Sequence, residues 1–181
     1  MKSLAFDPGT VSTGWSIFID GEPVANNKVR AVSSWNQSKR LGFILKGISE
    51  IITNEEPDII VVEEQHVGKN AKTSLITARA LGLIIAVAGI NDIPVYEFKP
   101  SEIKKAVTGM GNAPKEEVAQ ELLKIYKDSQ CVINIGDYID KGVNKTDDIY
   151  DAVGINHALK VLGDKRQEGT KKEPVYVSRA I

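Results

Sequence analysis

The chain has 181 residues, 42% of them apolar and 26% charged, which is typical of one globular domain whose core needs no disulfides or structural zinc. Its single cysteine, Cys131, excludes a disulfide framework and a cysteine-rich metal site, and it favours a reducing compartment. The net charge of −1 gives no general attraction to nucleic acid, and no apolar stretch reaches the roughly 18 residues of a membrane span, so we expect no membrane contact.

Apolar patterning predicts three strands and a helix in the first third of the chain. A short apolar run over 3–6 ends at the turn signal Asp7-Pro8-Gly9. Alternating residues over 15–20 and the stretch 24–34 complete a β-meander. Apolar residues then recur at helical spacing over 36–53, which predicts the first helix.

The rest of the chain alternates between strands and helices. The run IIVV over 59–62 is typical of a strand buried on both faces, and it ends at Glu63-Glu64. A further strand is predicted over 94–98, and the predicted helices are 71–90, 100–107, 114–127 and 147–162. The segment 128–146 looks irregular.

This order of elements predicts an α/β fold, with a mixed sheet flanked by helices on both faces. We expect one domain over 1–163, followed by a basic and mobile tail over 164–181.

Four carboxylates stand at the ends of predicted elements, where side chains from distant segments can converge. Asp7 ends the first strand, either member of the pair Glu63-Glu64 ends the buried strand, and Asp148 and Asp151 share a face near the start of the last helix. Each position also has an ordinary structural explanation: a turn, a strand emerging into solvent, or a helix cap.

As a group, these carboxylates indicate a metal site. Acids brought together repel one another unless cations neutralise them, and hard oxygen ligands select Mg²⁺ or Mn²⁺. Two such ions about 4 Å apart are the usual apparatus for in-line attack on a phosphodiester. The adjacent Asp147 is better explained as a residue that caps the helix N-terminus.

Four segments together resemble the RuvC family of Holliday junction resolvases, which are RNase H-like nucleases. They are FDPGTVSTGW, VVEEQHVGKNAKTSL followed by ARALG, PVYEFKPSEIKKAVTGMGNAPKEEV, and DDIYDAVGINHAL. The resemblance covers residues 3–127 and 147–160. It implies an RNase H-like fold with a five-stranded mixed sheet, three of whose strands are antiparallel.

The resemblance assigns site residues position by position. The family's aspartate in D-P-G falls on Asp7, and its final pair in D-x-x-D-A falls on Asp148 and Asp151. Its glutamate lies six residues after a proline, which favours Glu63 over Glu64, although strand alternation alone leaves the two open. The resemblance thus implies a working enzyme with two Mg²⁺ ions per site, for which Mn²⁺ can substitute, held by the catalytic residues Asp7, Glu63, Asp148 and Asp151.

DNA beside an acidic site must be held by basic side chains. Lys104 and Lys115 flank the turn 109–111 with the spacing of the family's phosphate-contacting lysines. Each lysine could equally belong to a solvated helix face. The further candidates for DNA contact are His66, Lys69, Asn70 and Lys105.

Histidine is a departure from the family at position 66, where an aromatic residue often stacks on junction bases. His66 would stack more weakly, contact phosphate, or serve as an ordinary loop residue. His157 lies off the face of the acidic pair, and we expect it to be structural or on the surface.

The segment 128–146 is longer than the family's usual connection, and the tail has no clear counterpart. We interpret Asp137 and Asp140 in that segment as turn residues. These departures indicate a divergent branch of the family, for which a phage is one alternative source.

The leading hypothesis is therefore a crossover junction endodeoxyribonuclease of DNA recombination and repair, which cuts four-way junctions by paired nicks in the cytoplasm of a bacterium or a phage-infected cell. Paired cuts need two active sites, which a C2 homodimer supplies, and the resemblance places the dimer interface on the helix 71–90.

Three alternatives stay open. The first is a nuclease that also cuts forks and flaps, and the second is a binder of branched DNA without catalysis. The third is an actin-like kinase or ATPase. Its phosphate loop resembles the stretch from Asp7 to Thr10 together with Thr13-Gly14, but such a protein requires two domains of this kind.

Overall fold

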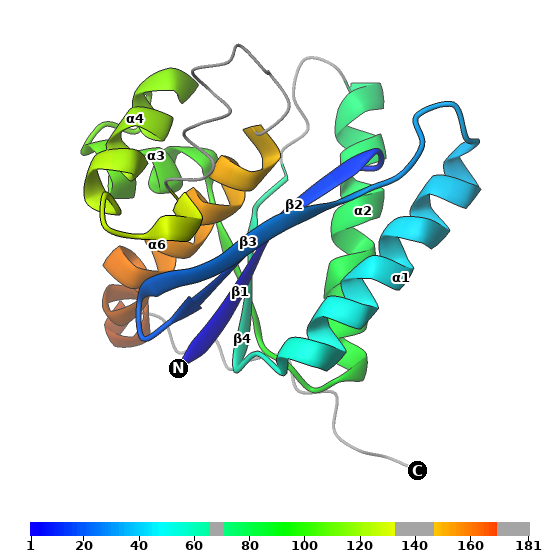
Figure 1. Ribbon diagram of the computed structural model, residues 1–181, viewed down its shortest axis with the longest axis horizontal. Helices are drawn as coiled ribbons and strands as arrows, with labels where there is room; N and C mark the ends of the chain where they lie inside the picture. Colours follow the sequence, from blue (N-terminus) through cyan, green and yellow to red (C-terminus); the bar gives the residue numbers. More distant parts are fainter. Residues whose placement is uncertain (66–70, 133–146, 170–181) are drawn as a thin grey trace.

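The computed structural model describes residues 1–65, 71–132 and 147–169. Its centre is a five-stranded sheet with the strand order β3-β2-β1-β4-β5 (Figure 1). The strands are β1 (Lys2–Asp7), β2 (Ser12–Ile19), β3 (Glu22–Arg30), β4 (Ile59–Glu63) and β5 (Val95–Phe98). The first three strands are antiparallel, and β4 and β5 run parallel to β1, which confirms the predicted mixed sheet.

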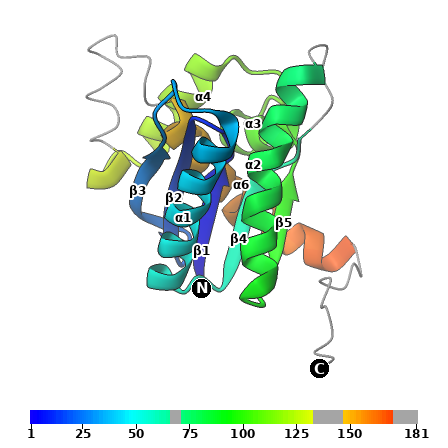
Figure 2. The same ribbon diagram turned by 90° about the vertical axis from the view of Figure 1, so that its right-hand side faces the viewer.

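Helices cover both faces of this sheet (Figures 1 and 2). One face carries α1 (Gln37–Glu55) and α2 (Ala71–Ile90), and the other carries α3 (Pro100–Thr108), α4 (Lys115–Ile125) and α6 (Asp147–Gly169). We call these the α1–α2 face and the α6 face. Local signals fix the ends of two helices. Asn36 caps the start of α1 by accepting a hydrogen bond from the Lys39 amide at 2.9 Å, and Gly109, with φ of 80°, caps the C-terminus of α3.

The inner strands are buried on both faces, as the IIVV run predicts. On β4, Ile60 and Val62 join the core on the α1–α2 face, whereas Ile59 and Val61 join the core on the α6 face. Strand β1 divides in the same way, with Ala5 on the α6 face. Since successive side chains alternate, the odd-numbered residues of both strands point toward α6.

A buried polar network docks α6 on the sheet. The Asn156 side chain accepts a hydrogen bond from Ser3 Oγ on β1 at 2.7 Å and donates one to the Ser16 carbonyl on β2 at 2.9 Å. The Ser16 hydroxyl in turn donates to the Ala152 carbonyl at 2.8 Å. A buried polar group left without its partner costs about 1–3 kcal/mol, so this network fixes where α6 lies over β1 and β2.

His157 is buried beside this network, and of its two expected roles the structural one is correct. Its Nδ1 lies 2.7 Å from the hydroxyl of Tyr126, and the two rings meet edge to face. Burial lowers the pKa of His157, so the imidazole is neutral in the core.

Several element boundaries differ from the predicted ones. Strand β3 ends at Arg30 rather than continuing to 34, and α4 ends at Ile125. Helix α6 continues past the predicted end at 162 to Gly169, so the start of the expected tail is helical. Within the expected irregular segment, residues 130–132 are helical, and Asp137 and Asp140 lie outside the described residues. No helix in the described part of the chain is long and apolar enough to span a membrane.

Candidate metal and nucleic-acid site

The sheet register brings Asp7 and Glu63 together. Strands β1 and β4 pair in parallel with Phe6 opposite Val62, so the next residues along, Asp7 and Glu63, leave the sheet side by side. Both have odd numbers, and the odd-numbered residues of β1 and β4 point toward α6. Two carboxylates from distant parts of the chain thus share one edge and one face of the sheet.

The same alternation directs the side chains of Glu63 and Glu64 to opposite faces of the sheet. Glu64 follows the even-numbered side chains Ile60 and Val62, which pack on the α1–α2 face. Its amide continues the pairing with β5 by donating to the Phe98 carbonyl at 2.8 Å. The geometry therefore places Glu63, and not Glu64, beside Asp7.

Close packing on Gly14 places the first turn of α6 beside Asp7. Gly14 is the β2 partner of Asp7. A Cβ atom built on Gly14 would lie 1.9 Å from the backbone oxygen of Asp148, so only glycine allows α6 to approach β2 this closely. The signal for this contact in the sequence is the position of Gly14 inside a strand, because a glycine there often marks the close approach of another backbone.

The pKa of Asp7 shows that the four acids share one electrostatic environment. It is raised well above its ordinary value, first because Asp7 is buried and then because Asp151, Asp148 and Glu63 carry like charge. The charge of Lys115 acts in the opposite direction. Among the described residues, three acids thus raise the pKa of Asp7 and one lysine lowers it.

Lys115 contacts this acidic group directly from the first residue of α4. Its Nζ lies 2.7 Å from Oδ2 of Asp151, and the two side chains are 65% and 28% exposed. An ion pair this exposed contributes little to stability. Lys115 is therefore well placed to exchange the carboxylate for another anion such as a phosphate.

The other basic candidates differ in position. Lys104 and Lys105 lie on α3, where Lys105 is exposed and Lys104 is half-buried. His66, Lys69 and Asn70 lie outside the described residues, so their roles stay predictions.

The chemistry of the site fits divalent cations. All four acidic groups are hard oxygen donors, and mutual repulsion disfavours their close approach without a cation. In the part of the chain that the structure describes, no three His, Cys, Asp or Glu side chains stand close enough to hold a metal as they are. A divalent ion bound among these acids would add its positive charge to that of Lys115.

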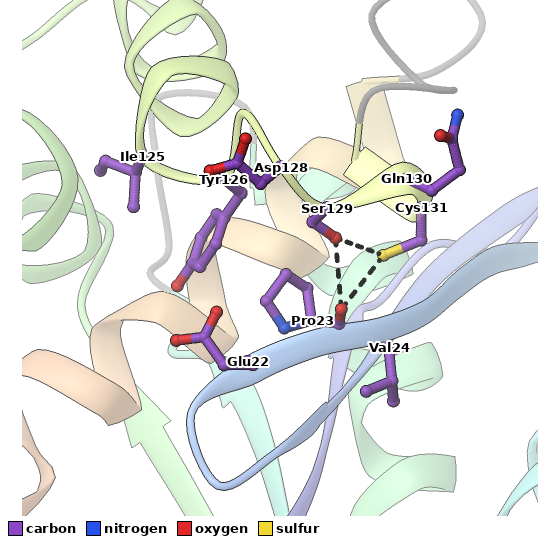
Figure 3. A pocket seen from close by; sticks show the side chains of 9 residues that line it. All are labelled: Glu22, Pro23, Val24, Ile125, Tyr126, Asp128, Ser129, Gln130 and Cys131. Atoms are coloured by element: carbon purple, nitrogen blue, oxygen red, sulfur yellow. Dashed lines mark hydrogen bonds between the residues drawn. The ribbon is translucent and has the colours of Figure 1, made fainter.

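A separate pocket of about 420 Å³ lies between α4 and the β2–β3 turn (Figure 3). The hydroxyl of Ser129 donates to the Pro23 carbonyl at 3.2 Å there, and Cys131 lies beside them. Glu22 also lines this pocket, and it pairs with Ile19 at the end of β2 remote from Gly14. The pocket is thus at the opposite end of the sheet from the carboxylates.

Comparison with known proteins finds a family match over most of the chain. Residues 3–141 match the family described as "Crossover junction endodeoxyribonuclease RuvC", a match that ends before Asp148. A protein of that description from Carboxydothermus hydrogenoformans is 35% identical over 162 residues, which cover 87% of this chain and 94% of that protein. One from Brevibacillus brevis is 31% identical over 95% of this chain and 100% of its own length.

Solved structures show the same fold. Thermus thermophilus RuvC in complex with a Holliday junction substrate matches with a TM-score of 0.75 at 22% identity, over 92% of this chain and 96% of that one. The yeast mitochondrial Holliday junction resolvase Ydc2 matches with a TM-score of 0.63 at 12% identity, over 92% of this chain and 80% of that one.

The packing of Gly14 generates a stability prediction. We expect Gly14→Ala to lower the free energy of unfolding by about 1–3 kcal/mol, because the added methyl group must push α6 off β2. Gly42→Ala on α1 is the matched control, since a Cβ there meets nothing within 4 Å, and it should be neutral or stabilising by up to about 1 kcal/mol. Urea denaturation measures both, and equal stability of the two variants would contradict the packing.

The raised pKa of Asp7 generates a pH prediction. Ionised Asp7 destabilises the folded, metal-free protein as the pH rises above its ordinary pKa of 3.8, because the folded state binds this proton more tightly than the unfolded state. Asp7→Asn should therefore raise the free energy of unfolding at pH 7 by on the order of 1 kcal/mol. This gain should shrink toward zero below pH 3.8.

Urea denaturation in EDTA at several pH values measures this gain, and the exposed Asp128→Asn variant serves as the control. A gain that does not change with pH, or a loss of stability at pH 7, would show that Asp7 is not under electrostatic strain.

Proposed function

The chain belongs to the family of crossover junction endodeoxyribonuclease RuvC, and from that membership we propose that it is a Mg²⁺-dependent endonuclease that resolves four-way DNA junctions by paired nicks. The observation that carries this proposal is the convergence of Asp7, Glu63, Asp148 and Asp151 in one electrostatic environment. Family membership decides against the actin-like kinase, and a retained set of acids argues against a binder without catalysis.

The four carboxylates are the proposed metal ligands and catalytic residues. Enzymes of this family are divalent-metal-dependent nucleases, and we propose two Mg²⁺ ions in each site, with Mn²⁺ able to replace them. Such ions supply charge neutralisation and an activated water for attack on the phosphodiester. The burial of Asp7 and the pairing of β1 with β4 would hold Asp7 and Glu63 at the same edge and on the same face of the sheet.

We propose that lysine side chains bind the phosphate backbone of the DNA. Lys115 already approaches Asp151 at 2.7 Å, so a phosphate beside the carboxylates would lie within its reach. Lys104 and Lys105 on α3 are further proposed contacts for the phosphate backbone. His66, Lys69 and Asn70 would complete the DNA contact, and action on cellular DNA would place the protein in the cytoplasm.

An exposed apolar face on α2 supports a homodimer. Leu75, Ile85 and Ile90 on this helix are 58%, 40% and 82% exposed, and a Cβ on Gly82 would meet nothing within 4 Å. An apolar helix surface of this kind is suited to cover by a partner. A second copy of the chain in C2 symmetry would cover it and would supply the second active site that paired nicks require.

Cleavage of a synthetic mobile four-way junction with Mg²⁺ tests the proposal. The wild type should nick the junction on two strands, and Asp7→Asn should lower the rate by at least about 1,000-fold, because it removes a proposed ligand from a site that acts as a unit. Forks, flaps and linear duplex of matched sequence measure how far the substrate range extends. Equal cutting by wild type and Asp7→Asn would remove Asp7 from the chemistry.

A further inference from the structure

Strand β3 presents two basic residues at the same end of the sheet as the carboxylates. Lys28 and Arg30, which we call the β3 basic pair, are the last charged residues of this edge strand. Arg30 is exposed and Lys28 is half-buried. Neither residue belongs to the four segments that carry the family resemblance, and neither side chain forms an ion pair with any described residue.

The sheet register places this pair in line with the acidic site. Lys28 pairs with Gly14 of β2, and Gly14 pairs with Asp7 of β1, so Lys28 and Asp7 occupy one row across the sheet. Arg30 pairs with Ser12, which lies two residues closer than Gly14 to the loop that follows Asp7. The end of β3 is tied to that loop, because the Ala31 amide donates to the Val11 carbonyl at 2.8 Å.

The β3 basic pair also lies on the same face of the sheet as the acids. Ala25 and Val29 of β3 pack against the core on the α1–α2 face. Asn26 points the other way, and its side chain donates at 3.0 Å to the carbonyl of Cys131, which packs against the core that α4 and α6 form. By alternation, Lys28 and Arg30 follow Asn26 onto the α6 face.

These placements set the reach of the pair. Neighbouring strands lie about 4.8 Å apart, so Lys28 starts about 10 Å from Asp7 along the row. Gly14 has no side chain, and the first turn of α6 with Asp148 lies over it. The pair therefore flanks the acidic group from the β3 side, while Lys115 contacts the group from α4.

Edge strands often carry charge simply to prevent pairing with another chain. That role would explain charged residues anywhere along an edge strand. On β3, however, the acidic residue lies at one end of the strand and the two basic residues lie at the other. The acidic Glu22 lies at the end remote from the site and is paired with Lys160 at 2.7 Å. Both basic residues lie at the end that carries the carboxylates, which favours a role toward an anionic ligand.

We propose that Lys28 and Arg30 hold the phosphate backbone of the DNA strand that crosses the carboxylate site. The proposal rests on the proposed function and extends it, because it adds a phosphate-binding surface on β3 to the lysines of α3 and α4. A strand that passes over a group of acids is repelled unless cations hold it on more than one side. The β3 basic pair would bind the phosphates of this strand on the β3 side of the acids.

Salt-dependent binding of a synthetic four-way junction in EDTA tests this surface without cleavage. Each phosphate contact that is lost should lower the slope of log K against log salt by about 0.9. We therefore expect lower slopes for Lys28→Gln and Arg30→Gln, and the double variant should lose both contacts and bind several-fold more weakly at about 100 mM salt. The charge-conserving Lys28→Arg should keep the wild-type slope.

The matched control is the double variant Lys46→Gln and Lys124→Gln, which removes the same charge from α1 and α4 at residues that pair within their own helices. It should leave the slope unchanged. If the pair variants, folded by circular dichroism, bind like this control while the wild type binds the junction, the β3 surface is wrong and the nuclease proposal stands. If the wild type does not bind the junction, the proposed function itself fails.

Discussion

The repulsion among four carboxylates, one of which is the buried Asp7, is the constraint on which this structure depends. Asp7 is buried, and three further acids raise its pKa, whereas among the described residues Lys115 lowers it. Such a group exists only because the surrounding fold is stable enough to hold it. The apolar strands β1 and β4, buried on both faces, supply that stability and end at the acids. The same repulsion that disfavours the metal-free state gives the site its attraction for divalent cations.

Helix α6 must reach this site with a defined orientation, and two features achieve it. The Asn156 network joins the helix to β1 and β2, and Gly14 lets the backbone at Asp148 rest on β2. Asp148 and Asp151 are thereby fixed on the side of the sheet to which Asp7 and Glu63 point. The site is therefore a product of packing over the whole α6 face, because its acids come from three separate elements.

Much of the architecture was predictable because it depends on local patterns. The IIVV run indicated a central strand, and the positions of Asp7, Asp148 and Asp151 at element ends indicated where acids converge. The choice between Glu63 and Glu64 was not predictable from alternation, since a wholly apolar strand does not show which face is which; only the two cores reveal it. The contact of Lys115 with Asp151 joins residues 36 apart, and the length of α6 depends on residues without apolar periodicity.

The most direct test of this account is anomalous diffraction from crystals grown with Mn²⁺. The account predicts anomalous peaks among the carboxylate oxygens of Asp7, Glu63, Asp148 and Asp151, with two ions in each site, and their loss in crystals of Asp7→Asn. A folded protein whose carboxylates bind no manganese at millimolar concentration, or whose manganese lies elsewhere, would contradict it.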